Sequence, residues 1–222
     1  NGIHHHYSNM KFEPNFDPNW FSATLVTLDL KLSEEAHRAI FDSEFDPKKV
    51  NRADGVDLLL ESAVNFYAPD ITQLEAEDFY SAKKDLDPER PMSHGLNSRL
   101  SRDNNGALYE EVFSETGRYS KSIKQIIKHL ENAIEVAENN GQAEALELLI
   151  KYYQTGDLSI WDEYNISWVS NTDGDVDYIN GFVEVYNYPM GYRGSYETIV
   201  QIKDFDASER MAVVADNVQW FE

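Results

Sequence analysis

The spacing of apolar residues changes near residue 175, and this change limits the fold more than any other feature of the sequence. Over residues 119–137, apolar side chains recur every three or four positions, which is the period of an α-helix with one buried face. Beyond residue 175 they alternate, which places Phe182, Glu184 and Tyr186 on one face of a predicted β-strand. We therefore predict an α+β fold that is predominantly helical, with a small β-sheet in the C-terminal third.

Other helices are indicated by the residues that start and stop them. Ser33, followed by two glutamates, predicts a helix that ends before residue 46, and Thr72 with Glu75 has the pattern of a capping box. A further helix is predicted over residues 50–67, and another begins at Tyr119 and is stopped by Asn139-Asn140-Gly141. A return helix follows over residues 142–154 and is closed by Gly156. The last two predicted helices are one capped by Ser159 with Asp162 and one that begins at Asp206.

The segments between these helices are predicted from their turn-forming residues. Residues 1–32 are predicted as loop, with at most one strand around residues 25–29. Residues 85–106, rich in proline, asparagine and glycine, are predicted as the longest loop. Alternation resumes over residues 195–203, which supplies the sheet with a second strand.

The charge of the chain excludes several functions. It has 19 Lys and Arg against 40 Asp and Glu, a net charge of −21. Because binding to nucleic acid or to an anionic membrane depends on clustered Lys and Arg, neither partner is expected. No apolar run approaches the ~20 residues of a membrane-spanning helix. The absence of cysteine excludes disulfides, thiolate metal sites and a cysteine nucleophile.

Metal-binding patterns in the sequence are weak. The six histidines include no pair at helical ligand spacing, and the run at residues 4–6 is the nearest approach to a cluster. Three aspartates within residues 173–177, together with Glu184, have the spacing of a calcium loop, but its sixth position requires glycine and here is Tyr178. We therefore predict no metal site in the chain and an acidic turn at 173–177, with an acidic calcium-binding domain as an alternative.

Glu184 and Tyr186 are the most suggestive pair of polar residues. In a cleft, the carboxylate can hold an ammonium group while the phenol, which is a hydrogen-bond donor at neutral pH, donates to a developing oxyanion. The other interpretation is a solvent-facing glutamate beside a half-buried tyrosine. Glu197 has the same ambiguity, and the spacing alone does not decide between the two.

Four segments of the chain are similar to bacterial dipeptidyl peptidase III. They are NGIHHHYS at 1–8, HGLNSRLSRDNNGALYEEVF at 94–113, YYQTGDLSIWDEYNISWV at 152–169 and INGFVEVYNYPMGYRGSYE at 179–197. The segments follow the family's order over nearly the whole chain. One departure is Tyr188, where the family is expected to have aspartate.

The resemblance implies a two-lobed, zinc-dependent exopeptidase that removes dipeptides from the N-terminus of short peptides. The family binds zinc through a His-Glu-x-x-Gly-His helix and a further glutamate, and no such motif occurs within residues 1–222. The chain is therefore expected to lie upstream of that motif and to be inactive alone. Residues 1–205 would form most of the substrate-binding lobe, and residues 206–222 the start of a helix leading toward the zinc-binding lobe.

The resemblance also assigns roles to three residues. Tyr186 matches the tyrosine that hydrogen-bonds the scissile carbonyl oxygen, Glu184 matches a carboxylate that anchors the α-ammonium group of the substrate, and Glu197 matches a second acid in the same subsite. The implied partners are a short peptide and the remainder of the same polypeptide. The implied compartment is the cytoplasm, with the periplasm left open. A non-catalytic acidic peptide-binding or interaction module is the alternative function.

Overall fold

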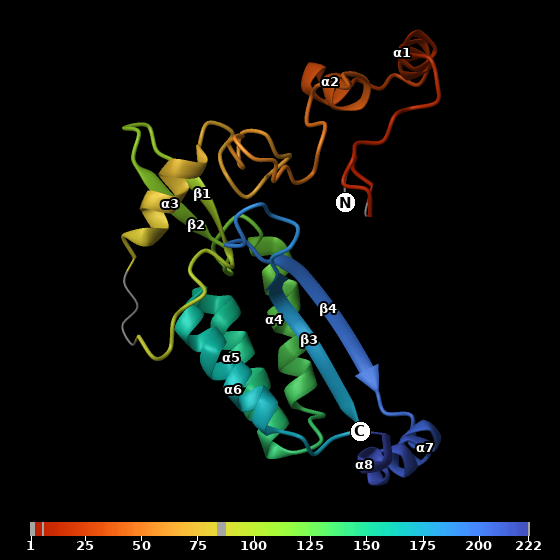
Figure 1. Cartoon of the computed structure of the whole chain (residues 1–222), viewed down its shortest axis with the longest axis vertical. Helices are drawn as coiled ribbons and strands as arrows, with labels where there is room; N and C mark the ends of the chain where they lie inside the picture. The colour runs from red at the N-terminus through yellow and green to blue at the C-terminus, as the bar shows by residue number, and fades with distance from the viewer. Residues whose placement is uncertain (1–2, 6, 84–87, 222) are drawn as a thin grey trace. The chain divides into compact units, whose positions relative to one another are not determined.

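The computed structural model describes residues 3–5, 7–83 and 88–221, which form two compact units. Unit 1 comprises Asn1–Val112 and Glu184–Ser195, and unit 2 comprises Phe113–Val183 and Tyr196–Glu222. Figure 1 shows the helices and strands of both. Among the described residues, 41% are helical and the strands form two small antiparallel sheets, so the α+β prediction is confirmed. No unit boundary falls at residue 205, and the division into lobes at that point stays a prediction.

Unit 1 begins with a helix that the sequence prediction missed. Helix α1 spans Pro18–Thr27, where loop with at most one strand was expected. The carboxylate of Asp17 accepts the backbone N–H groups of Asn19 and Trp20, and Pro18 occupies the first helical position. Because proline at that position has its backbone already set for a helix, this start signal outweighs the loose alternation of residues 25–29.

The next two helices of unit 1 follow their predicted caps. Helix α2 spans Glu34–Phe41, and the Ser33 hydroxyl accepts the N–H of Ala36. Helix α3 spans Gln73–Ser81, and Thr72 with Glu75 forms the predicted capping box. Both starts are confirmed because a cap is made by atoms within three residues of each other.

The predicted helix over residues 50–67 is wrong. This segment forms turns, in which the carboxylate of Asp57 accepts the backbone N–H groups of Leu59 and Leu60. Its apolar residues nevertheless reach a core, since Leu59 and Tyr67 are buried. The spacing of the apolar residues therefore reflects their burial and does not indicate a helix. Side chains in the turns accept hydrogen bonds from backbone N–H groups that a helix would otherwise pair.

A β-hairpin replaces part of the predicted loop at residues 85–106, of which residues 85–87 lie outside the described residues. Strand β1 (Ser98–Arg102) pairs antiparallel with strand β2 (Leu108–Val112), with Leu100 opposite Glu110. The Asn- and Gly-rich stretch at 104–106 is the turn between the strands. The core of unit 1 packs around this hairpin and contains Leu59, Tyr67, Ile71, Ala76, Tyr80, Leu100 and Tyr188.

The first three helices of unit 2 occur in the order that the sequence predicts. Helices α4 (Ser120–Ile134), α5 (Asn140–Thr155) and α6 (Leu158–Ser170) pack in consecutive pairs (Figure 1). Gly156 ends α5 with a φ of 73°, as expected. Two predicted caps are wrong, because Asn139 starts α5 instead of stopping α4, and Asp157, not Ser159, caps α6.

The rest of unit 2 comes from the C-terminal part of the chain. Strands β3 (Val176–Glu184) and β4 (Ser195–Ile202) form the second sheet, and helices α7 (Phe205–Asp216) and α8 (Val218–Phe221) follow. Asp204 caps α7, two residues before the predicted start at Asp206. Among the described residues, none of the helices has the length and apolar character needed to cross a membrane.

The capping box of α3 predicts a pH dependence of stability. The backbone N–H of Thr72 (3.0 Å) and then the guanidinium of Arg102 (2.8 Å) lower the pKa of Glu75 from 4.5 to about 2. A carboxyl whose pKa is lower in the folded state stabilises the fold above its unfolded pKa and loses that effect as the pH falls. The free energy of unfolding of Glu75→Gln should therefore depend less on pH than that of the wild type between pH 4.5 and about 2.

Chemical unfolding at several pH values in this range measures the effect. Glu77→Gln, an exposed glutamate on the same helix, is the control and should keep the wild-type slope. Equal slopes for Glu75→Gln and the wild type would contradict the prediction.

Candidate functional site

The predicted site residues lie at the connection between β3 and β4. Glu184 is the last residue of β3 and is half-buried, whereas Tyr186 follows in a turn closed by the N–H of Tyr188 on the carbonyl of Val185 (3.2 Å). The prediction that Glu184 and Tyr186 share one strand face is therefore wrong, because the strand ends before Tyr186. Both residues belong to unit 1, and Glu197, a half-buried residue of β4, belongs to unit 2.

Tyr186 lines a hollow on unit 1. Its side chain is 56% exposed. The hollow has a volume of about 440 Å³ and is lined by Asn9, Lys49, Val50, Arg52, Tyr186 and Asn187. The Lys49 ammonium donates to the side-chain oxygen of Asn187 at 2.9 Å. Tyr186 is thus presented to solvent beside cationic and amide groups.

Tyr188 fixes one side of this turn. The residue is buried, its ring stacks on Phe66 with centroids 5.2 Å apart, and its hydroxyl donates to Asn65 at 2.7 Å. Arg52 donates to the Tyr188 carbonyl at 3.1 Å. The tyrosine that departs from the family pattern is therefore a core residue, and the aromatic stacking makes it an anchor for the turn.

Arg193 fixes the other side of the turn. Its side chain is fully buried, and its guanidinium lies over the rings of Tyr67 and Tyr80, 4.8 and 5.0 Å from their centroids. One terminal nitrogen, Nη1, donates to the carbonyl of Gly95 and to the hydroxyl of Ser98, and the other donates to the hydroxyl of Tyr80. The turn is held on the β1–β2 hairpin by these bonds.

Glu110 on β2 provides the charge that balances Arg193. One carboxylate oxygen lies 3.6 Å from Nη1 of Arg193 and accepts hydrogen bonds from the hydroxyls of Tyr80 and Ser98, both at 2.8 Å. The other oxygen accepts a hydrogen bond from the ammonium group of Lys83 at 2.7 Å. Burial raises the pKa of Glu110, but the hydrogen bonds from Lys83, Ser98 and Tyr80 outweigh it, so the net pKa lies below the ordinary value. Glu110 is therefore charged at neutral pH.

Sequence analysis did not single out Arg193, Glu110 or Tyr80. Nothing in their local spacing distinguishes them, since they come from three segments far apart in the chain. The one available signal is that Arg193 and Glu110 lie in two of the segments that carry the family resemblance, at 179–197 and 94–113. In the structure, hydrogen bonds from Arg193 to Gly95 and Ser98 join these two segments.

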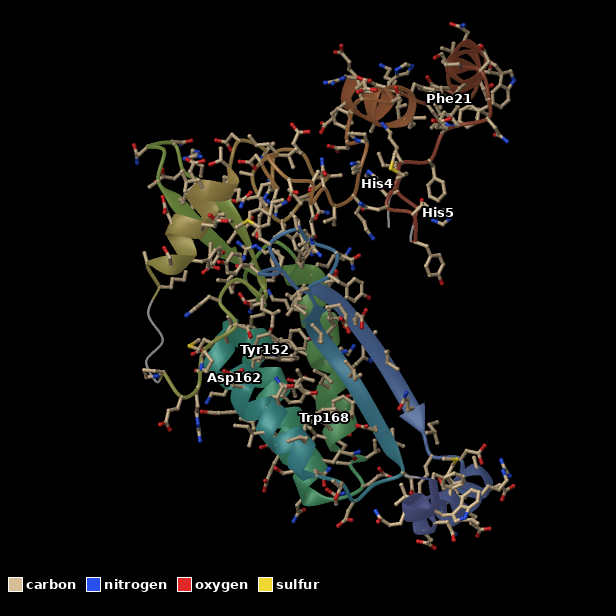
Figure 2. All side chains as sticks on the ribbon, in the orientation of Figure 1. His4, His5, Phe21, Tyr152, Asp162 and Trp168 are labelled. Atoms are coloured by element: carbon tan, nitrogen blue, oxygen red, sulfur yellow. The ribbon has the colours of Figure 1, made fainter. Side chains whose placement is uncertain are left out.

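The acidic turn at residues 173–177 does not have the form of a calcium loop. The Glu138 carboxylate accepts the backbone N–H groups of Asp175 and Val176, and Asp177 accepts the indole N–H of Trp168 at 2.9 Å (Figure 2 labels Trp168). Glu184 lies at the far end of β3, roughly 23 Å from Asp177 at about 3.3 Å per residue. A single ion cannot be bound by both.

Residues 92–221 match the model of peptidase family M49. The chain belongs to this family. It is 23% identical to dipeptidyl peptidase 3 of Dictyostelium discoideum over 177 residues, which are 70% of this chain and 25% of that protein. With dipeptidyl peptidase 3 of Rattus norvegicus the identity is 27% over 105 residues, which are 46% of this chain and 14% of that protein.

Solved structures of the family agree in fold. The structure of DPP III from Caldithrix abyssi matches with a TM-score of 0.57 and 19% identity, over 90% of this chain and 38% of that one. The dipeptidyl-peptidase III of Corallococcus sp. strain EGB matches with a TM-score of 0.54 and 16% identity, over 90% of this chain and 37% of that one. The resemblance stated from sequence segments is thus confirmed, and this chain spans about a quarter or less of the curated relatives described above.

The described residues do not form a zinc site. The Nε2–H of His4 donates to the carbonyl of Asp46 at 2.7 Å, and the ring of His5 contacts Phe12 with centroids 5.6 Å apart (Figure 2). His6 lies outside the described residues. Within residues 3–5, 7–83 and 88–221, no group of three or more His, Cys, Asp or Glu side chains is placed to hold a metal ion. The described residues therefore offer no cluster of side chains that fits a zinc ion.

Two glycines allow the Arg193 anchor to be tested. Gly95 and Gly106 both have a φ of +88°, which costs any L-residue roughly 1–2 kcal/mol. A methyl group at Gly95 would overlap Nη1 of Arg193 and crowd the ring of Tyr80, whereas one at Gly106 meets nothing within 4 Å. Gly95→Ala should therefore lower the free energy of unfolding by about 1–3 kcal/mol more than Gly106→Ala.

Denaturant unfolding of both variants measures this difference, and Gly106→Ala serves as the control for backbone strain. Equal losses of stability in the two variants would show that the contact of Gly95 with Arg193 is not tightly packed.

Proposed function

We propose that this chain forms substrate-binding structure of a zinc-dependent dipeptidyl peptidase that releases dipeptides from the N-terminus of short peptides. Membership of peptidase family M49 supports the reaction class. The observation that carries the proposal is the setting of Tyr186, an exposed phenol on a turn fixed by Tyr188 on one side and by Arg193 on the other. Exposed polar groups on rigidly held loops are typical of functional sites.

In this proposal, Tyr186 donates its phenol hydrogen to the oxygen of the scissile carbonyl. A phenol is neutral and a donor at pH 7, so no ionisation is needed. The donor stabilises the negative charge that develops on that oxygen, and fixed orientation of the turn avoids the cost of ordering it during the reaction. The anchors at Tyr188 and Arg193 support this role because they hold the turn without covering the phenol.

The α-ammonium group of the peptide is assigned to Glu184 and Glu197. An ammonium group removed from water needs a carboxylate partner, and an exopeptidase places its cut relative to that anchor. The half-buried setting of Glu184 at the end of β3 is compatible with a strong charge-assisted hydrogen bond.

The zinc and its ligands are proposed to come from further polypeptide, because the His-Glu-x-x-Gly-His pattern does not occur in residues 1–222. Residues 1–205 then belong to the substrate-binding lobe and residues 206–222 lead toward the zinc-binding lobe. The 222-residue chain alone is expected to hydrolyse no dipeptidyl arylamide, with or without added zinc. A cytoplasmic location stays a prediction.

Replacement of Tyr186 by phenylalanine tests its role in the peptidase that contains this chain. Loss of one oxyanion donor typically costs ~10²–10³ in kcat. Tyr186→Phe should show this loss in steady-state hydrolysis of a dipeptidyl arylamide, with KM little changed. Tyr109→Phe, which alters a 46% exposed tyrosine on β2, is the control and should retain activity. Wild-type kcat in Tyr186→Phe would remove this residue from catalysis.

Replacement of Glu184 by glutamine tests the ammonium anchor. A hydrogen bond to a charged group contributes about 1.5–3 kcal/mol, so kcat/KM for peptides with a free N-terminus should fall roughly tenfold to a hundredfold. N-acetylated peptides should be cleaved poorly and equally by variant and wild type. Glu131→Gln, at an exposed carboxylate of α4, is the matched control.

An unchanged preference of Glu184→Gln for the free N-terminus would contradict the anchor role. If neither Tyr186 nor Glu184 affected turnover while the chain still bound peptides, the alternative of a non-catalytic peptide-binding module would replace the present proposal.

A further inference from the structure

Two cations, Lys49 and Arg52, line the hollow beside Tyr186. Several cations in the described parts of the chain lie within 4.0 Å of carboxylates, in the pairs Lys83–Glu110, Arg102–Asp70, Arg102–Glu75, Arg193–Glu110, Arg38–Asp42 and Lys203–Asp175. Lys49 and Arg52 instead donate to uncharged oxygens, as Lys11 does to the backbone carbonyls of Asp42 and Phe45. What sets Lys49 and Arg52 apart is that both line one hollow, in a chain whose net charge is −21.

The two cations are held in place by the same turn that presents Tyr186. Lys49 donates to the side-chain oxygen of Asn187 at 2.9 Å, and Arg52 donates to the carbonyl of Tyr188 at 3.1 Å. An ammonium group has three donor hydrogens and a guanidinium five, so these single bonds leave several donors on each side chain for a further acceptor. Both positive groups are therefore oriented but not neutralised.

The composition of the hollow specifies the chemistry of its ligand. Among the described residues, its lining has Lys49, Arg52, the amides of Asn9 and Asn187, and the phenol of Tyr186, but no Asp or Glu. Its volume of about 440 Å³ lies within the range of roughly 300–1,000 Å³ that is usual for small-molecule sites. A cationic, donor-rich hollow of this size suits an anionic group carried on a short chain.

We propose that this hollow, the Lys49 hollow, binds a carboxylate of the peptide substrate close to the scissile bond. The inference rests on the proposed function, since Tyr186 at its wall is the residue assigned to the scissile carbonyl. The carboxylate is either the side chain of an Asp or Glu residue or the C-terminal carboxylate of a very short peptide, and both present the same planar pair of oxygens to Lys49 and Arg52. The hollow thus gives the enzyme a preference for acidic or very short peptides.

Lys49 is expected to contribute more to this preference than Arg52. Lys49 is half-buried, whereas Arg52 is exposed. Because solvent and salt screen an exposed charge more strongly, an ion pair at Lys49 retains more of its attraction. The preference for a carboxylate should also weaken as the salt concentration rises.

The test is a binding measurement that requires no turnover. Two matched pairs of peptides are titrated against the 222-residue chain by calorimetry: Ala-Ala-Glu-Ala-amide against Ala-Ala-Gln-Ala-amide, and Ala-Ala-Ala-Ala against its C-terminal amide. We expect one carboxylate peptide to bind roughly tenfold more tightly than its amide partner, as a charge-assisted hydrogen bond would produce. A difference in the first pair identifies a side-chain carboxylate, and one in the second pair identifies the C-terminal carboxylate.

Variants then assign the preference to the hollow. Lys49→Gln should abolish it and Arg52→Gln should reduce it, while Lys121→Gln, which removes an exposed cation of α4, should leave it unchanged. Unfolding midpoints of the variants show whether each remains folded. Retention of the preference in both Lys49→Gln and Arg52→Gln would overturn the proposal, as would equal affinities within both peptide pairs or the absence of binding by all four peptides.

The two proposals can fail separately. If Tyr186→Phe retained full turnover while the carboxylate preference was present, the catalytic assignment would be wrong and the Lys49 hollow would stand as a binding site. If Tyr186→Phe lost turnover while the peptide pairs bound equally, the catalytic assignment would stand and the Lys49 hollow would not.

Discussion

A single buried cation, Arg193, holds together the part of this protein on which its proposed function depends. It joins the turn after β3 to Gly95 and Ser98 of the neighbouring hairpin, and Glu110 balances its charge. Removal of one partner from a buried ion pair typically costs about 3–5 kcal/mol, because the other charge is left without compensation. Arg193 and Glu110 therefore stabilise this arrangement only as a pair, and the aromatic rings around the guanidinium exclude the water that would otherwise solvate it.

The same turn combines a fixed backbone with exposed polar side chains. Tyr188 and Arg193 point into the core of unit 1, while Tyr186, between them and β3, is more than half exposed. Because the backbone of the turn is already ordered, a ligand that contacts Tyr186 does not have to bear the entropy of ordering it. This division between buried anchors and an exposed donor is the physical basis for assigning function to Tyr186.

Charge is distributed unevenly over an otherwise acidic chain. Most acidic side chains contribute to a general negative field that keeps nucleic acid and anionic surfaces away. The Lys49 hollow is a local exception, with two oriented cations at the wall that carries Tyr186. In the proposed enzyme the acidic residue Glu184 attracts the positive end of a peptide, and Lys49 and Arg52 attract a negative group of the same peptide. Opposite local charges would then orient the substrate along the site.

Features made by neighbouring residues could be predicted from the sequence, and features made by distant residues could not. The caps at Ser33 and Thr72 and the end of α5 at Gly156 depend on atoms within a few positions, so the local pattern determined them. Glu184 and Tyr186 were singled out by the alternating pattern, and the family resemblance gave them roles. The strand face that they were expected to share does not exist, because the strand ends at Glu184 and the chain turns toward the buried Tyr188 and Arg193. Turns at residues 50–67 and the pairing of Arg193 with Glu110 were likewise decided by the tertiary structure. The stable backbone conformation is the one that buries apolar surface and pairs polar groups through contacts between distant segments. A local sequence pattern does not contain that information.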